Sequence, residues 1–302
     1  MHKKRMYTAI SLSLLVIGAM LLSACGLFTP DLGTEENPIV WAFVPSGEME
    51  RVTAGAEAVA DLLHEATGLY FETTVATEYA GVIEAMCADP PQAHMASLAT
   101  FAYLLANSRG CAEAELVSVR YGSPSYNGQI FVRADSGITS LSELSGTTFC
   151  RGDEYSTSGW IIPSIDLQAA GVDLAGLTII DTGSHENSVI GVYRGDCVAG
   201  ASYVDARSRV EEEFTDVLEV ITVIQTSVDI PNDGVQYIPA VSRELRDQIN
   251  TALLAMVETE EGAAALDTAY QWGALELHDH SFYVPFVELL DAAGMAPEDL
   301  LD

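Results

Sequence analysis

The chain has 302 residues, of which 49% are apolar, so it is long enough for about two domains with substantial cores. It contains 13 basic and 44 acidic residues, which gives a formal net charge of −31. Such a charge would repel a phosphate backbone and argues against nucleic-acid binding, although local donors can still bind a small anion.

The N-terminus has the pattern of an export signal. A basic start, 2–5, precedes an apolar stretch, 7–22, that is too short for a permanent membrane span. The stretch ends in Leu22-Ser23-Ala24-Cys25-Gly26, which resembles the lipobox of bacterial lipoproteins. The resemblance implies a signal peptide over 1–24 that is cleaved before Cys25, and lipidation of Cys25 as the membrane anchor. A plain secretory signal with a chance cysteine is the alternative.

After the signal, the chain from 25 to 37 contains Pro, Gly, Thr and Glu with few apolar residues, which predicts a tether between the lipid and the folded body. Cleavage would also remove three basic residues and change the net charge from −31 to −34. The mature protein is therefore expected outside the cytoplasm, on the periplasmic side or the cell surface.

Four cysteines follow Cys25, and an oxidising exterior permits disulfides between them. Pairing of nearest neighbours gives Cys87 with Cys111 and Cys150 with Cys197. Sequence alone does not fix the connectivity. No Cys or His spacing typical of a zinc site occurs, so no metal or other cofactor is expected.

Hydrophobic patterns alternate between strands and helices, which predicts α/β architecture with largely parallel sheets. The first part is expected to contain strands at 38–44, 69–76, 94–98 and 115–121, and helices at 48–66, from 77, and at 99–107. The second part is expected to contain extended segments at 126–133, 147–151, 177–181, 197–204 and 217–226, and helices from 156 to 171, at 185–193 and at 205–213. Segment 134–146 is expected to contain turns and a short helix with Leu141 and Leu144. Three further helices are expected at 242–257, 260–268 and 283–293.

The order of these elements predicts two α/β lobes joined by a two-strand hinge. Lobe 1 comprises 38–132 and 226–302, and lobe 2 comprises 133–225. Ligands of open α/β sheets bind beyond the carboxyl ends of strands and at helix N-termini. The cleft between the lobes is therefore the expected binding site, and a monomer is expected.

The segment Asp153-Glu154-Tyr155-Ser156-Thr157-Ser158-Gly159-Trp160 follows a predicted strand and precedes a helix. The first N–H groups of a helix lack partners within the helix, and the helix dipole makes that end partly positive. Such an end can bind an oxyanion, and Ser156, Thr157 and Ser158 add hydroxyl donors. The alternative is an ordinary helix cap without a ligand, because Ser and Thr are preferred there.

Ser, His and Asp residues all occur near the expected cleft, so a hydrolase triad is a further alternative. No Gly-x-Ser-x-Gly elbow is present, and the Ser-Thr-Ser-Gly turn is accounted for by anion binding. The sequence therefore favours a binding protein over an enzyme.

Five segments, in order and with matching spacing, resemble the substrate-binding proteins of phosphonate, phosphite and phosphate ABC importers. The similarity extends over about 38–290. The segments are Ala76-Thr77-Glu78-Tyr79-Ala80 with Ile83-Glu84-Ala85, Asp135-Ser136-Gly137-Ile138 with Leu144-Ser145-Gly146, Ser156-Thr157-Ser158-Gly159, Gly183-Ser184-His185, and Ile230-Pro231-Asn232-Asp233.

This resemblance implies a type II periplasmic-binding-protein fold that closes around its ligand. It implies that Ser156, Thr157 and Ser158 bind the oxyanion, with Tyr79 from lobe 1 and His185 from lobe 2. Hydroxyl, N–H and imidazole donors suit such a ligand.

The chain departs from the family pattern near Thr100. Phe101 stands where the family commonly has a tyrosine whose hydroxyl reaches the anion, and Thr100, Ser97 and Tyr103 are candidate substitutes. Asp205 and Asp233 match approximately the carboxylates with which some members bind the amine of aminoalkyl phosphonates. For these two residues a helix cap and a hinge turn are the alternatives.

The resemblance thus implies an extracytoplasmic lipoprotein that binds a phosphorus oxyanion by hinge closure and delivers it to a membrane permease. A protein that binds another anion, such as a sulfonate, and a sensor for a signalling protein are the alternatives.

Overall fold

The computed structural model describes residues 30–295 and 297 of the chain. The predicted signal peptide over 1–24 and the predicted lipid-anchor residue Cys25 lie outside the described residues. No helix within the described part of the chain is both long enough and apolar enough to span a bilayer.

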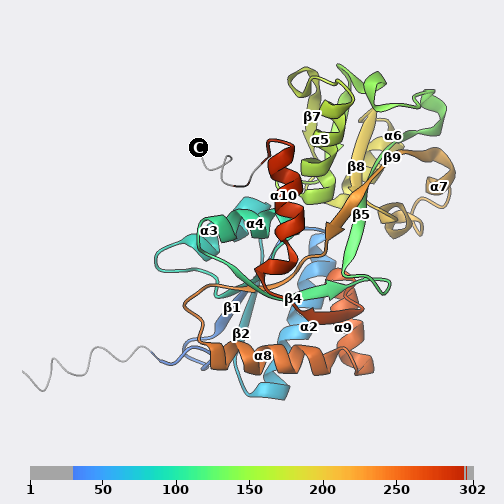
Figure 1. Cartoon of the computed structure of the whole chain (residues 1–302). Helices are drawn as coiled ribbons and strands as arrows, with labels where there is room; N and C mark the ends of the chain where they lie inside the picture. The colour runs from blue at the N-terminus through green and yellow to red at the C-terminus, as the bar shows by residue number, and fades with distance from the viewer. Residues whose placement is uncertain (1–29, 296, 298–302) are drawn as a thin grey trace, which may run out of the picture.

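The fold is α/β and is built on two separate mixed sheets, which form two lobes (Figure 1). The first sheet has six strands in the order β11-β4-β10-β3-β1-β2, and the second has five in the order β7-β6-β8-β5-β9. The strands of the first sheet are β1 (Ile39–Phe43), β2 (Phe71–Val75), β3 (Met95–Ser97), β4 (Glu113–Val119), β10 (Gly234–Tyr237) and β11 (Ala274–Leu277). Those of the second are β5 (Ser125–Arg133), β6 (Thr148–Arg151), β7 (Thr178–Asp181), β8 (Ala199–Tyr203) and β9 (Ile221–Pro231).

Helices cover both sheets, and Figure 1 shows α5, α6 and α7 around the second sheet and the other labelled helices around the first. The helices of lobe 1 are α2 (Met49–Thr67), α3 (Tyr79–Cys87), α4 (Thr100–Ser108), α8 (Arg243–Met256), α9 (Glu260–Tyr270) and α10 (Val284–Ala292). Those of lobe 2 are α5 (Ile162–Ala169), α6 (His185–Arg194) and α7 (Val217–Val220).

The alternation of side chains along β5 shows how lobe 2 is packed. Ile130 and Val132 lie in one apolar cluster with Leu167 of α5, whereas Phe131 lies in another with Val189 of α6. Successive strand residues point to opposite faces, so one continuous apolar run supplies the cores on both sides of the sheet. Lobe 1 has a single large cluster.

The predicted α/β fold class is confirmed, but the sheets are mixed rather than largely parallel. β1 pairs in parallel with β2 and β3, whereas β10 is antiparallel to both β3 and β4. In lobe 2, β5 is antiparallel to β8 and β9. Each of these four antiparallel pairs contains β5, β9 or β10, the strands next to the two connections between the lobes.

Local predictions differ from the structure in the C-terminal half. The extended segment expected at 217–226 begins with the short helix α7, and the helix expected at 205–213 is a 3-10 turn over Ala206–Val210. Strands β10 and β11, with four residues each, were not predicted.

Two connections join the lobes, between β4 and β5 and between β9 and β10. Both β5 and β9 pair within the second sheet along their whole length, and Figure 1 shows them side by side. The chain therefore enters the second sheet at Ser125 and leaves it at Pro231.

The described part of the expected tether, 30–37, packs on lobe 1 as a turn. The N–H of Gly33 donates to the carbonyl oxygen of Asn37 at 2.8 Å, and the N–H of Tyr70 donates to that of Gly33 at 2.9 Å. The side chain of Leu32 contacts the lobe 1 core. This segment is therefore part of the folded body.

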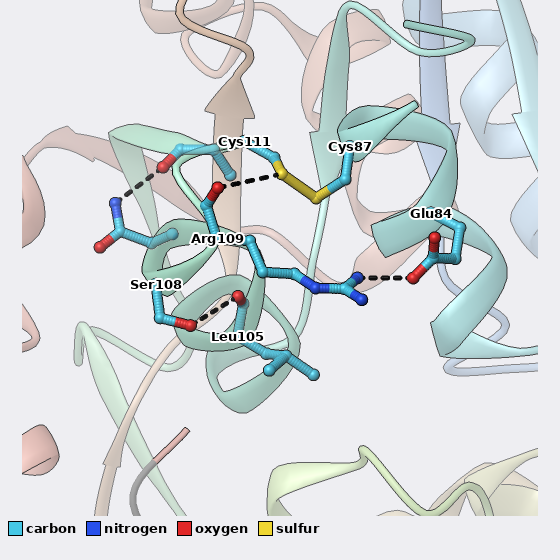
Figure 2. The surroundings of a disulfide bond; sticks show 8 residues. Glu84, Cys87, Leu105, Ser108, Arg109 and Cys111 are labelled. Atoms are coloured by element: carbon cyan, nitrogen blue, oxygen red, sulfur yellow. Dashed lines mark hydrogen bonds and ion pairs between the residues drawn. A yellow bond between two sulfur atoms is a disulfide. The ribbon is translucent and has the colours of Figure 1, made fainter. Parts of the chain in front are cut away.

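The described residues contain two disulfides, Cys87–Cys111 in lobe 1 and Cys150–Cys197 in lobe 2. These are the pairs suggested by proximity in the sequence. Figure 2 shows that the first links the end of α3 to the segment that follows α4. Each disulfide lies within one lobe, so neither restrains the two lobes relative to each other.

Candidate functional site

The Ser-Thr-Ser turn lies at the start of a helix, as predicted. Ser156 precedes a π-helical turn, Thr157–Ile161, which continues into α5. The Ser156 Oγ accepts a hydrogen bond from the N–H of Gly159 at 3.1 Å. The N–H groups of Thr157 and Ser158 have no hydrogen-bond partner among the described residues. Two donors at the partly positive end of a helix are thus available to an anion.

A cavity of about 240 Å³ lies between the lobes, and most of the predicted binding residues line it. Residues from both lobes line it. The predicted residues that line it are Tyr79, Thr100, Ser156, Ser158, His185, Asp205 and Asp233.

Thr157 and Phe101 do not line the cavity but contact each other. The N–H of Phe101 donates to the Thr157 Oγ1 at 2.9 Å, across the lobe interface. The Phe101 side chain is fully buried in the lobe 1 core. The Thr157 hydroxyl therefore joins the lobes. The absence of a hydroxyl on Phe101 does not change the cavity wall, because the Phe101 ring lies in the lobe 1 core and does not line the cavity.

Thr100 lines the cavity from the start of α4. Its hydroxyl donates to the carbonyl oxygen of Pro231 at 2.5 Å. This bond fixes the end of β9 against lobe 1, close to the second connection between the lobes.

His185 is held by hydroxyl groups. Its Nδ1 is 2.9 Å from the Ser202 Oγ, and its Nε2 is 3.4 Å from the Ser156 Oγ. Burial, and then the positive charge of Arg120, lower the pKa of His185 from 6.5 to about 4. The imidazole is therefore neutral near pH 7 and has one donor and one acceptor nitrogen. Because both partners are hydroxyls, no carboxylate orients the ring as in a Ser-His-Asp triad.

Tyr79 enters the cavity from the first turn of α3. Burial, and then the charge of Asp153, raise the pKa of the Tyr79 phenol well above 10, so the phenol remains a proton donor. The backbone N–H of Tyr79 donates to the Asp153 Oδ2 at 3.0 Å. A carboxylate of lobe 2 thus caps a helix of lobe 1.

Asp233 and Asp205 lie in different environments. Both Asp233 oxygens accept from the Arg120 guanidinium, the Oδ2 from its Nη2 at 3.0 Å. Trp272 Nε1 also donates to Asp233 Oδ2 at 3.0 Å. Asp233 is therefore paired inside the protein, whereas Asp205 is exposed at the cavity wall and has φ of 67°.

Several cavity residues were not identified from the sequence. The most informative are Arg120, Tyr126 and Tyr203, which lie at or next to the ends of β4, β5 and β8. Burial raises the pKa of Tyr126 to about 12, while hydrogen bonding with Ser158 opposes this shift. Their position could have identified them in the sequence, because aromatic and basic residues at the ends of strands near the connections between the lobes face the cleft.

The positively charged side chains that line the cavity are paired. Arg120 is matched by Asp233, Arg51 by Glu186 of the other lobe, and His185 is neutral. The donors that remain to bind an anion are neutral: the N–H group and the hydroxyl of Ser158, and tyrosine phenols. Such donors, fixed in a buried site, can replace the hydration of a small anion.

Comparison with known protein families shows to which family the chain belongs. The family described as "ABC transporter, phosphonate, periplasmic substrate-binding protein" matches residues 41–283. The chain belongs to this family.

Two relatives in the family are similar in sequence over part of their length. The Phosphate-import protein PhnD of Mycolicibacterium smegmatis is 31% identical over 201 residues, which are 61% of this chain and 62% of the relative. The Phosphonates-binding periplasmic protein of Escherichia coli is 24% identical over 210 residues, 66% of this chain and 60% of the relative. The matches thus span about three fifths of the length of these relatives.

Solved structures confirm the periplasmic-binding-protein fold. A binding protein component of an ABC phosphonate transporter from Pseudomonas aeruginosa has a TM-score of 0.77 at 21% identity, covering 85% of this chain and 87% of that one. PhnD1 from Prochlorococcus marinus, in complex with methylphosphonate, has a TM-score of 0.74 at 12% identity, covering 85% and 98%.

Proposed function

We propose that this chain is the extracytoplasmic solute-binding component of an ABC importer. It captures a small phosphorus oxyanion in the cavity between its lobes and presents the closed, loaded form to a membrane permease. Membership in the phosphonate-binding family supports this role. The cavity supports it too, because it is lined by Tyr79, which has a phenol, and by Ser158, which has a hydroxyl and an N–H group without a partner among the described residues.

The mechanism is ligand-stabilised closure of the two lobes, without a chemical step. The connections between β4 and β5 and between β9 and β10 act as the hinge. A ligand that contacts Tyr79 from lobe 1 and Ser158 from lobe 2 binds the closed form better than the open one, which shifts the population toward closure. A diacylglyceryl-modified Cys25 anchors the protein to the membrane, after removal of the signal peptide over 1–24.

The preferred ligand is phosphate, phosphite or a short alkyl phosphonate rather than an aminoalkyl phosphonate. An ammonium group needs a free carboxylate near the oxyanion seat. Asp233 already accepts from Arg120 and Trp272, and Asp205 is exposed to solvent at the cavity wall. Burying an ammonium beside a carboxylate that is already paired is costly.

The test is calorimetric titration of the purified protein with phosphate, phosphite, methylphosphonate, 2-aminoethylphosphonate and methanesulfonate. At least one of the first three is expected to bind more tightly than the last two. Failure of all the phosphorus oxyanions to bind would reject the proposed function. Tighter binding of 2-aminoethylphosphonate would instead reject only the ligand preference.

Ser158→Ala tests the oxyanion seat. It removes a hydroxyl at the cavity wall and is expected to weaken binding of the best ligand by about 1–3 kcal/mol, as for a hydrogen bond to a charged group. Ser164→Ala is the matched control, because the Ser164 hydroxyl is buried in the same helix but donates to the Ile161 carbonyl at 2.7 Å. Equal affinities of the two variants would show that the seat is placed wrongly.

A further inference from the structure

Arg51 of α2 and Glu186 of α6 form an ion pair between the two lobes. The Arg51 Nη2 is 3.0 Å from the Glu186 Oε1. The Glu186 side chain is only 3% exposed and that of Arg51 is 25% exposed. Glu186 does not line the ligand cavity, whereas Arg51 does. The pair is thus a contact between the lobes at the edge of the site.

Each charge is also held from within its own lobe. The Arg51 Nη1 donates to the carbonyl oxygens of Thr268 and Ala269, at 2.9 and 3.4 Å, near the end of α9. Glu186 lies in the first turn of α6, where the helix dipole favours a negative charge. The Arg51 side chain is therefore held by its own lobe, and the Glu186 charge is favoured by its own helix.

The environment of Glu186 makes its pairing depend on closure. Its second oxygen, Oε2, is buried and has no hydrogen-bond partner among the described residues. A buried carboxylate that loses its only cationic hydrogen-bond partner keeps the whole cost of its removal from water. The backbone also fits closely there, because a Cβ on Gly47 would lie 2.0 Å from the Arg51 Nη2.

We infer that Arg51 and Glu186 form a charge latch that pairs only in the closed form and so tunes ligand affinity from outside the oxyanion seat. This inference rests on the proposed function, since it assigns a role to closure in anion binding. The competing role for Arg51 is direct attraction of the anion, because its guanidinium lines the cavity. If Arg51 acts as a latch, its contribution to affinity depends on Glu186. If Arg51 attracts the anion directly, its contribution does not depend on Glu186.

A double-mutant cycle with Arg51→Met and Glu186→Gln distinguishes them, with the best of phosphate, phosphite and methylphosphonate as the probe. For a latch, Arg51→Met weakens binding about tenfold in the wild-type background, within the range of measured pair couplings. In the Glu186→Gln background the same change costs less than about twofold, because no buried carboxylate is left unpaired.

An equal loss in both backgrounds would overturn the latch, because Arg51 would then act directly on the anion. Tighter binding by Glu186→Gln alone, with an undiminished effect of Arg51→Met, would overturn it for the same reason. Arg109→Met is the matched control. Arg109 pairs with Glu84 at 2.5 Å (Figure 2), but this ion pair is exposed and lies within lobe 1. Its loss is expected to leave affinity unchanged.

Small-angle X-ray scattering of the ligand-free proteins gives a second measurement that does not depend on the proposed function. Arg51→Met is expected to increase the radius of gyration in the wild-type background, because the closed form is less populated. In the Glu186→Gln background, Arg51→Met is expected to cause no further increase. If the wild type binds none of the oxyanions, the proposed function fails while this comparison still judges the latch. Identical radii for all four proteins would overturn it.

Discussion

The Tyr126 phenol lies in the cavity and interacts with the Ser158 hydroxyl, at the point where β5 enters lobe 2. We predict that Tyr126→Phe weakens oxyanion binding by about 1–2 kcal/mol, because a donor from a buried site is lost. Calorimetry of the variant measures the change.

Phe101→Tyr is expected to destabilise the fold without improving binding, because it adds a hydroxyl to a fully buried ring in the lobe 1 core. Tighter binding by Phe101→Tyr would contradict this placement.

His185 gives the stability of the protein a specific pH dependence. Its pKa is about 4 in the folded protein and near 6.5 when unperturbed, because burial and Arg120 disfavour the charged ring. Between these values the unfolded chain holds more protons, so stability that is present above pH 6.5 is lost as the pH falls toward 4. The shift corresponds to about 3 kcal/mol at most.

Urea unfolding of the wild type and His185→Gln at pH 7 and pH 4.5 isolates this contribution. Half-buried Asp153 and buried Glu186 have raised pKa values and act in the opposite direction, but they are common to both proteins. The wild type is expected to lose more stability than the variant on acidification. Parallel losses would show that His185 is not buried in a neutral form.

Residue patterns alone located part of the cavity. Ser158, Tyr79 and His185 were expected there because small hydroxyls, a phenol and an imidazole follow strand ends or open helices, and they do line it. Thr157 shares the same motif, yet its hydroxyl faces Phe101 of the other lobe. Which side a helix-start hydroxyl faces depends on the partner lobe, and sequence spacing does not contain that information.

Helix α3 is stabilised from the opposite lobe, which links one element to closure. Asp153 accepts from the N–H of Tyr79 at 3.0 Å and from that of Tyr155 at 2.7 Å. We predict that Asp153→Ala weakens ligand affinity by about 1 kcal/mol, the usual value of a helix cap, because this cap exists only when the lobes are closed. Ligand titration of the variant provides the measurement.

The control for this prediction is Asp173→Ala. Asp173 accepts from the N–H of Ala175 at 3.1 Å, a local bond like that between Asp153 and Tyr155, but it is exposed and lies within lobe 2. Unchanged affinity is expected for Asp173→Ala. If both variants bind equally well, the cap on α3 does not contribute to closure.

The helices and longer strands were predictable because their apolar periods and end signals are local. Ser242, for example, was expected to begin a helix and accepts from the N–H of Leu245 at 3.3 Å. Strand β10 has no such signal, since all four of its residues are buried between β3 and β4. A Cβ on Gly234 would lie 1.9 Å from the Leu116 carbonyl oxygen. The formation of β10 therefore depends on its pairing with β3 and β4, which the local sequence does not reveal.

The whole protein is strongly acidic, although its cavity is the site that we propose for an anion. The net charge of −31 opposes the approach of such a ligand, whereas the positive charges that line the cavity are paired and its other donors are neutral. The long-range repulsion is screened by salt, since the Debye length falls from about 30 Å at 0.01 M to about 10 Å at 0.1 M ionic strength. Contacts within the buried site are screened much less.

We therefore predict that the association rate of the oxyanion rises severalfold between about 10 and 100 mM ionic strength, while the dissociation rate changes little. Stopped-flow measurements at each salt concentration give both rates. The series is run with chloride and with glutamate as the salt anion, which separates screening from competition for the seat. An association rate that falls in both salts would mean that an unpaired positive charge attracts the ligand, and Arg51 and Arg120 would then not be neutralised by their partners.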